Sequence, residues 1–368
     1  MLQLDTQQLT STRLIEQMTT AEKERAAHVE QVLPALCQAA EEVDQSGEFY
    51  RPHVETLRQA QLMGLLVPTQ YGGLGGSLRD LAGATFAMGT ACPSTALAYF
   101  FHNSSVSRGL LAIEAAEAGL FSEKEAAVVH AFGEKVLCKM GQEKMLLGNF
   151  ASETVKSSQS AVFISTEARP TEDGWLVSGT KSFGCNTGVA DEYLVTAKIA
   201  GSEGADGIAL FFVPRERAGV SERPSWNAMG MRGTASHGIV LDNVFVPEEE
   251  ALTVSGAFVK MMSLSRGSLL GYQCAISAIY LGVAQRAYDF ALEFTTNLKF
   301  QDTGKPIATS PFHQELFGKM TVDLETAYLW ERRQIELESS EPPLRPKADV
   351  LKQWRMAKGQ IAEAAYRV

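Results

Sequence analysis

Cysteine and histidine are scarce in this chain of 368 residues, which has five cysteines and six histidines. The cysteines are odd in number, widely spaced and never form a C-x-x-C pair: Cys37, Cys92, Cys138, Cys185 and Cys274. We therefore expect free thiols in a reducing, cytoplasmic compartment and not a disulfide framework. The histidines are equally scattered, and none has the spacing of metal ligands, so we predict no metal site.

Long basic runs and long apolar runs are also missing. The formal net charge is -10, and no stretch of Lys and Arg is long enough to follow a phosphate backbone, so we expect no nucleic-acid partner. No apolar run is long enough to cross a bilayer, and the polar, acidic N-terminal region lacks the features of a targeting signal. Hydrophobic residues at 45% and charged residues at 21% are typical of a globular protein with two or three domains.

The hydrophobic period divides the chain into three blocks. Residues 1–150 have the helical period, whereas residues 151–250 have the period of two that is typical of strands. Residues 251–368 are again helical, with a largely apolar segment from Leu269 to Ala287 that we expect to be buried on most sides. Two more helices are expected, one from Phe312 to Glu338 and one from Lys347 onward. The pattern is still helical at Val368, which suggests a further C-terminal segment.

The middle block contains short candidate strands separated by turn residues. They are Ala161–Ser165, Trp175–Val177, Tyr193–Lys198, Ile208–Val213, His237–Leu241 and Val244–Val246. Asp173-Gly174 lies between the first two and predicts a hairpin. The expected fold class is therefore α+β, with an N-terminal helical domain, a middle antiparallel β-domain and a C-terminal helical bundle.

The hairpin leads into Phe183-Gly184-Cys185-Asn186, where small residues follow an aromatic one. A flat ligand could approach the backbone at such a place. The alternative is that Asn186-Thr187-Gly188 is only a turn that needs a positive φ, with Phe183 packed in the core.

Five short motifs, in this order and spacing, resemble the acyl-CoA dehydrogenase family of flavoproteins over essentially the whole chain. They are Tyr71–Gly75, Gly174–Lys181, Met229–Thr234, Val244–Pro247 and Leu281–Gln285. The resemblance implies the same three-block architecture, usually assembled as a homotetramer, with FAD at the domain and subunit junctions.

The resemblance also implies which residues hold the flavin ring. Ser152 and Glu153 correspond to the family's first flavin-contacting strand, and Phe183, Gly184, Cys185 and Asn186 to its second. Two family elements are altered. Thr154–Gln159 stands where a Pro-x-x-Gly-Ser-Asp sequence is usual, and only Thr303–Lys305 remains of an R-x-x-F-G element. FAD is the expected cofactor, and FMN is possible.

The family's reaction needs a carboxylate base to remove the α-proton of an acyl thioester. One family position for it lies beyond Val368. The other falls at Tyr272-Gln273 or at Ser265-Arg266, where there is no carboxylate. His102, which the resemblance places near the flavin cavity, is our candidate for acid/base chemistry, although a histidine among aromatic residues is more often a hydrogen-bonded core residue.

Three functions remain open. The first is an FAD-dependent dehydrogenase of acyl-CoA or acyl-carrier-protein thioesters, which passes electrons to an electron-transfer flavoprotein. The second is a monooxygenase supplied by a flavin reductase, which the missing base and the room for oxygen at Gly184-Cys185 favour. The third is a non-catalytic acyl-binding or subunit-binding homologue. A homo-oligomer is expected in each case.

Overall fold

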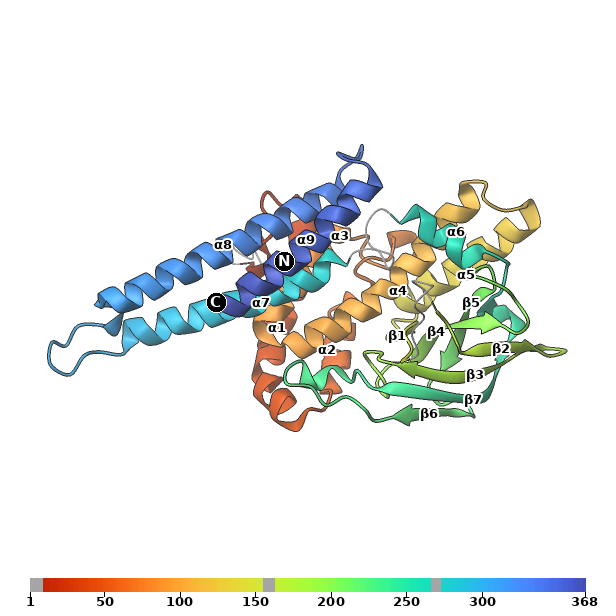
Figure 1. Cartoon of the computed structure of the whole chain (residues 1–368), viewed down its shortest axis with the longest axis horizontal. Coiled ribbons are helices and arrows are strands. Elements are labelled where there is room, and N and C mark those ends of the chain that lie inside the picture. The colour runs from red at the N-terminus through yellow and green to blue at the C-terminus, as the bar shows by residue number, and fades with distance from the viewer. Residues whose placement is uncertain (1–8, 155–162, 266–272) are drawn as a thin grey trace.

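The computed structural model describes residues 9–154, 163–265 and 273–368. Helices form both ends of the chain and a curled β-sheet lies between them in sequence (Figure 1). The predicted fold class is confirmed, with a helical domain, a β-domain and a helical bundle in that order. Within these residues, no helix is long and apolar enough to cross a membrane.

Five α-helices form the N-terminal domain. They are α1 (Thr20–Ser46), α2 (Pro52–Gln59), α3 (Leu78–Ala91), α4 (Pro93–Glu117) and α5 (Glu123–Gly141). The residues that show the helical period in the sequence are on the inner faces of these helices: Leu33, Leu36 and Val43 on α1, and Leu78, Leu81, Thr85 and Met88 on α3, are buried, and Ala40 on α1 is partly buried.

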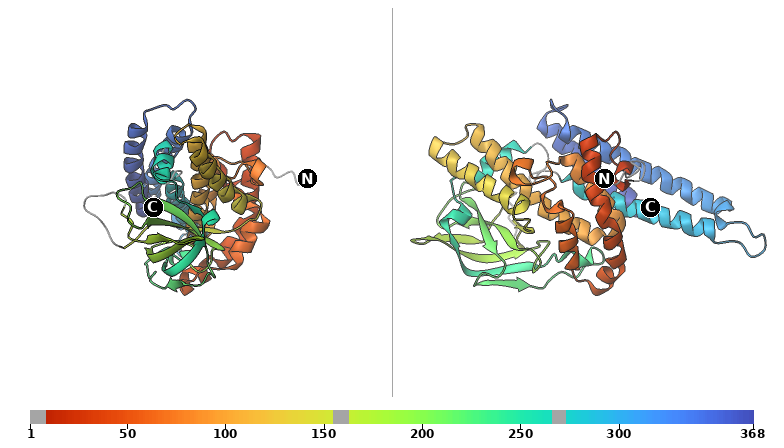
Figure 2. Two further views of the ribbon diagram at one scale, coloured as in Figure 1. Left: turned by 90° about the vertical axis from the view of Figure 1, so that its right-hand side faces the viewer. Right: turned by 180° about the vertical axis from the view of Figure 1, so that it is seen from behind.

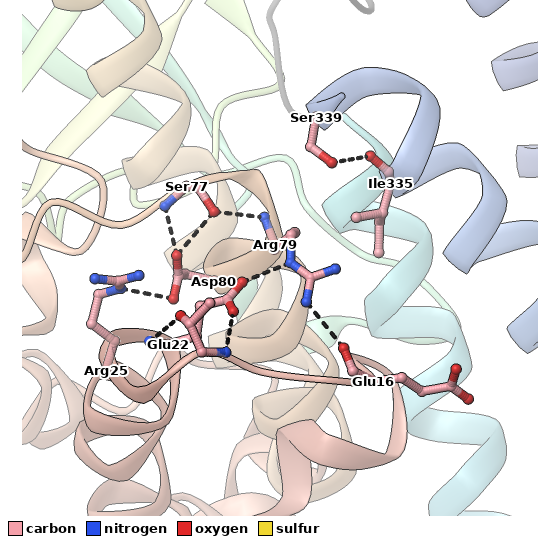
Figure 3. Close-up of polar contacts among 9 residues, drawn as sticks. Glu16, Glu22, Arg25, Ser77, Arg79, Asp80, Ile335 and Ser339 are labelled. Atoms are coloured by element: carbon pink, nitrogen blue, oxygen red, sulfur yellow. Dashed lines mark hydrogen bonds and ion pairs between the residues drawn. The ribbon is translucent and has the colours of Figure 1, made fainter. Parts of the chain in front are cut away.

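The N-termini of α1 and α3 each have a capping box, and the acidic residues of the two boxes form ion pairs between the helices (Figure 3). In each box the N-cap hydroxyl accepts a backbone N–H from the first turn, and an acidic side chain, Glu22 or Asp80, accepts the N-cap N–H. Each carboxylate also pairs with an arginine of the other helix: Arg79 with Glu22 at 2.6 Å, and Arg25 with Asp80 at 2.8 Å. The polar first turn of α3 therefore fixes this helix against α1.

The strands form one sheet with the order β6-β7-β3-β2-β4-β5-β8, and β1 pairs with β4 in parallel. Their bounds are β1 (Leu147–Phe150), β2 (Glu167–Pro170), β3 (Gly174–Ser182), β4 (Glu192–Ile199), β5 (Ile208–Pro214), β6 (Val220–Arg223), β7 (Gly238–Pro247) and β8 (Ala251–Leu252). Most neighbours are antiparallel, as expected, but β2 and β4 also run parallel.

Two of the strand predictions were wrong in detail. Residues 163–165 are not a strand, and residues 161–162 lie outside the described part of the chain. The hairpin partner of β3 is β2, which has only Ala168 buried between polar residues and so lacks an apolar run. The two predicted strands after His237 form the single strand β7, which stays paired with β3 across an irregularity in register.

The C-terminal helices are α6 (Ala257–Leu264), α7 (Cys274–Asn297), α8 (Pro311–Ser339) and α9 (Lys347–Arg367). The predicted limits of α8 and the predicted start of α9 are confirmed to within a residue. The apolar segment expected to be buried, Leu269–Ala287, corresponds within the described residues to the first half of α7, which is buried on most sides. Beyond it, α7 and α8 extend from the body as a pair with exposed apolar side chains, among them Phe290 and Phe294 (Figure 2).

Glycine sets the distance between α3 and α7. A Cβ on Gly282 would lie 2.3 Å from the carbonyl oxygen of Phe86, and one on Gly89 would lie 2.9 Å from that of Ile279. Thr85 Oγ1 also donates to the carbonyl oxygen of Ala275. The glycine of the Leu281–Gln285 motif is therefore explained by close packing of these two helices.

Two carboxylates are buried between α7 and α8. Glu331 is fully buried and accepts a hydrogen bond from Ser277 Oγ at 2.7 Å, and Glu338 accepts one from Gln334. Burial is the main cause that raises the pKa of Glu331 to about 8 and that of Glu338 to about 7, since no cation pairs with either among the described residues. Both groups therefore favour the protonated form in the folded chain.

This shift predicts a pH-dependent stability. The contribution of Glu331 is complete below its ordinary pKa of 4.5 and is lost as the pH rises through about 8, because unfolding then releases its proton. Each pKa unit is worth about 1.4 kcal/mol, so the free energy of unfolding changes by a few kcal/mol. We expect the free energy of unfolding, measured with urea, to fall clearly less between pH 5 and pH 8 for Glu331→Gln than for the wild type.

The matched control is Glu336→Gln on the same helix, where the carboxylate is exposed and pairs with Arg333. This variant should follow the wild-type pH dependence. Equal slopes for all three proteins would show that Glu331 is ionised in the folded chain.

Candidate functional site

Two exposed residues that the sequence analysis assigned to a flavin lie side by side. Ser152 follows β1, and its carbonyl oxygen accepts the backbone N–H of Ser182, the last residue of β3, at 3.1 Å. Phe183 comes next and is 52% exposed. The hydroxyl of Ser152 and the ring of Phe183 are therefore both accessible to a ligand, and Phe183 is not the core residue of the alternative interpretation.

A second aromatic residue adjoins Phe183. The Trp226 ring meets the Phe183 ring edge to face, with centroids 5.6 Å apart, and its Nε1 donates to the Met231 carbonyl oxygen. The backbone N–H groups of Ser225 and Trp226 both donate to Nδ1 of His237, which fixes the ring proton on Nε2 when the imidazole is neutral. The sequence analysis did not assign Trp226 or His237 to the site, because Trp226 lies in a loop without periodicity and His237 was counted only as the start of a strand.

Glu153 is held inside the β-domain below this face. Its two oxygens accept hydrogen bonds from the backbone and hydroxyl groups of Ser165 and Thr166, and Oε1 lies 2.6 Å from Nζ of Lys181. Burial alone would raise the pKa of Glu153, but the Lys181 ammonium and these hydrogen bonds together lower it to about 2. Glu153 is therefore a fixed anion with its acceptor sites occupied, and it is not available as a base.

The three residues after Phe183 face the protein interior. A Cβ on Gly184 would lie 2.4 Å from the Phe150 ring, so the missing side chain is filled by that ring and leaves no space there. The Cys185 thiol is buried 2.9 Å from Ser236 Oγ, and burial raises its pKa to about 12. Asn186 has a φ of 67° and donates from Nδ2 to the Ala98 carbonyl oxygen, which ties the β-domain to α4.

His102 lies on α4 and is fully buried. Its Nε2 lies 2.8 Å from the carbonyl oxygen of Met63, and its Nδ1 accepts the backbone N–H of Leu147 at 3.0 Å. Burial is the largest of the effects that lower the pKa of His102 to about 4, so the ring is neutral at physiological pH. Neither nitrogen is free for a substrate in this arrangement, and the contacts are those of a residue that joins α4 to β1.

The residues present fit one face of a flavin. An exposed aromatic ring can stack on the isoalloxazine, and the adjacent Ser152 hydroxyl can hydrogen-bond to the ring edge. The Glu153–Lys181 pair holds the two strand ends in register. Of the residues considered above, Glu153 is the only carboxylate, and it is already engaged. The two positions considered for a base at Tyr272 and Arg266, and the altered segment from residue 155 to 159, lie outside the described residues.

Comparisons with known proteins show the family of the chain. The models of the acyl-CoA dehydrogenase N-terminal, middle and C-terminal domains match residues 19–118, 149–244 and 265–368. A putative acyl-CoA dehydrogenase of Bacillus subtilis, YdbM, is 29% identical over 292 residues, which are 79% of this chain and 70% of that protein. Dibenzothiophene monooxygenase of Rhodococcus erythropolis is 28% identical over 303 residues, 78% of this chain and 67% of that protein.

Solved structures show the same fold. KijD3 in complex with dTDP has a TM-score of 0.76 at 22% identity and covers 97% of this chain and 86% of its own. FMN-bound TdsC from Paenibacillus sp. A11-2 has a TM-score of 0.73 at 22% identity, with 93% and 82% covered. With three consecutive domain models matched in order, this chain belongs to the acyl-CoA dehydrogenase family, which includes flavin-dependent monooxygenase relatives.

Proposed function

We propose that this protein is an FAD-dependent dehydrogenase that introduces an α,β double bond into an acyl thioester. The observation that carries the proposal is the pairing of the exposed Phe183 ring with the accessible Ser152 residue on the β-domain face that the family motifs specify. The acyl-CoA dehydrogenases among the relatives support the choice of reaction. FMN is possible in place of FAD, because some proteins with this fold are described with FMN.

The protein's own residues bind and orient the reactants in this proposal. A bound flavin would supply the hydride acceptor. Phe183 would stack on one side of the ring system, with Trp226 supporting Phe183 from the edge. Ser152 would donate a hydrogen bond to the ring edge. Glu153 and Lys181 take no part in proton transfer, since both are buried and paired with each other.

The proton acceptor is not at this face. His102 has both nitrogens engaged with backbone groups, so we propose for it the role of positioning β1, and with it Ser152, against α4. A base supplied by residues outside the described ranges or by another subunit fits these contacts better than a catalytic His102.

Assembly and partners follow from the C-terminal helices. The projecting halves of α7 and α8 expose large apolar side chains, which are Phe290, Phe294, Phe312, Leu316, Val322 and Leu329. Such a surface is typical of an interface between subunits.

We propose a homotetramer that takes acyl-CoA or acyl-carrier-protein thioesters and reduces an electron-transfer flavoprotein. The five free cysteines agree with a cytoplasmic location.

The first prediction of the proposed function concerns the flavin spectrum. We expect the purified protein to contain bound flavin, and its visible absorbance to bleach without oxygen when a suitable acyl-CoA thioester is added. The reason is that α,β-dehydrogenation transfers two electrons from the thioester to the flavin. A panel of saturated straight-chain and branched acyl-CoA thioesters, recorded by anaerobic titration, provides the measurement.

A bound flavin that no thioester bleaches would contradict the dehydrogenase. If supplied reduced flavin and oxygen then gave an oxygenated product, the monooxygenase would replace it. The Phe150 ring that fills the space at Gly184 argues against that alternative, because it removes the room for oxygen that had suggested it. If the protein does not bind flavin at all, the remaining function is that of a non-catalytic acyl-binding or subunit-binding homologue.

The second prediction tests the aromatic face. We expect Phe183→Ala to weaken flavin binding about tenfold or more, because a stacked aromatic pair and its buried area contribute about 1.5 kcal/mol or more. Flavin affinity can be measured by fluorescence quenching on the apoprotein. Phe245→Ala is the matched control, since Phe245 is an exposed phenylalanine on β7 and should leave the affinity unchanged. Equal affinities for both variants would exclude Phe183 from the flavin site.

A further inference from the structure

Helix α4 carries a buried arginine without an anionic partner. Arg108 is fully buried, and its Nε and Nη2 atoms have no hydrogen-bond partner. Its Nη1 points to the sulfur of Met262 on α6, and its guanidinium carbon lies 5.2 Å from the centre of the Phe258 ring. Among the ion pairs of the described residues, none includes Arg108.

This arrangement is incomplete in energetic terms. A buried charge without a partner costs several kcal/mol, and a thioether sulfur and an aromatic face compensate only part of that cost. Burial lowers the pKa of Arg108 to about 10, so the side chain is still charged at neutral pH. A guanidinium with two free donors is completed best by a carboxylate or phosphate, which can accept two parallel hydrogen bonds.

A second unpaired polar group lies beside Arg108. The Ser105 hydroxyl is fully buried and has no hydrogen-bond partner. Ser105 and Arg108 are three residues apart on α4, so their side chains are neighbours on one helix face. Two adjacent unsatisfied groups are unusual in a native interior, where buried polar atoms are nearly always paired. Together they can supply three hydrogen bonds to one anionic group.

This part of α4 adjoins the proposed flavin face. Leu147 of β1 contacts His102 of α4, and Asn149 Nδ2 donates to Ser104 Oγ at 3.1 Å, so strand and helix advance in the same sense. Ser152 follows Asn149 along one segment and Arg108 follows Ser104 along the other. Figure 1 shows α4 beside α6 and next to β1. Residues 147–152 and residues 102–108 therefore run in the same direction, so Arg108 lies towards the same end as Ser152 of the proposed flavin face.

We propose that Arg108 and Ser105 form a subsite for an anionic oxygen group of the thioester ligand. The group is either a carboxylate at the far end of the acyl chain or a phosphate of the carrier, and both offer the same chemistry to the guanidinium. The subsite deepens the proposed function, because it rests on a thioester that binds between α4 and the Ser152–Phe183 face. It makes charge, and not only chain length, a determinant of substrate choice.

The experiment compares ligands that differ by one anionic group. Dissociation constants are measured by isothermal titration calorimetry on the flavin-loaded full chain, with three pairs of acyl-CoA: succinyl and butanoyl, adipoyl and hexanoyl, suberoyl and octanoyl. The carrier arm compares CoA with dephospho-CoA, which lacks the 3'-phosphate, and hexanoyl-4'-phosphopantetheine with hexanoyl-pantetheine. We expect one arm to show about a 30-fold preference for the more anionic ligand, which corresponds to a buried charge pair of about 2 kcal/mol.

Arg108→Met should remove that preference and raise the melting temperature of the ligand-free protein, since a buried unpaired charge is replaced by an apolar side chain. The matched control is Arg217→Met, in which an exposed arginine that donates to the Phe245 carbonyl oxygen is lost. This variant should keep the wild-type preference. Because affinity is measured, a failure of thioesters to bleach the flavin would contradict the proposed reaction without affecting the test of the subsite.

Wild-type protein that shows no preference for the more anionic member in any pair would overturn the proposal, and so would an anion preference that Arg108→Met leaves intact. If Arg108→Met does not fold, the wild-type ligand pairs still decide, with Ser105→Ala as the second variant. Loss of one of three hydrogen bonds should reduce the preference severalfold. A preference for the phosphate-bearing ligand alone would assign the subsite to the carrier, and one for the ω-carboxyl ligand alone would assign it to the acyl chain.

Discussion

The buried contact between Glu153 and Lys181 determines the shape of the β-domain edge that we propose as the flavin face. The ammonium lies 2.6 Å from the carboxylate, and both side chains are removed from solvent. Glu153 also binds Ser165 and Thr166, so one carboxylate joins the end of β1, the segment before β2 and strand β3. Loss of one partner from such a pair costs about 3–5 kcal/mol, because the remaining charge is left unpaired. The positions of Ser152 and Phe183 depend on this contact.

Helix α4 connects that edge to the rest of the molecule. Its His102 accepts the backbone N–H of Leu147 on β1, and its Ala98 carbonyl oxygen accepts Nδ2 of Asn186 after β3. The same helix presents Arg108 to α6. Three regions far apart in the sequence thus meet along one helix. On this helix the buried side chain of His102 has both nitrogens hydrogen-bonded, whereas Ser105 and Arg108 keep polar atoms without a partner.

The sequence predicted the elements accurately where a regular hydrophobic pattern extends over many residues. Helices α8 and α9 were predicted to within a residue, because their apolar spacing and the proline-rich break between them are local signals. Strand β2 was misplaced, because its single buried residue, Ala168, gives no alternation that can be recognised. Strands β1 and β6 were missed because their sequences, Leu-Gly-Asn-Phe and Val-Ser-Glu-Arg, show no alternation of apolar and polar residues.

For the site, the sequence identified residues that belong to a motif but not residues whose role depends only on tertiary contacts. The motif led to Ser152 and Phe183, which the structure leaves exposed, while Glu153 turned out to be fully engaged in contacts. Trp226 and Arg108 could not be found from the sequence, because their significance comes from a neighbour distant in the chain: Phe183 for one and α6 for the other. The same holds for the elevated pKa of Glu331, which depends on burial between two helices.

The most direct test of the central claim is a crystal structure of the protein with its flavin bound. The account predicts the isoalloxazine ring against the Phe183 side chain, with its edge within hydrogen-bond distance of Ser152 and with Glu153 still bound to Lys181. A flavin located elsewhere, or a Phe183–Trp226 face covered by another part of the assembly with no room for the ring, would contradict it.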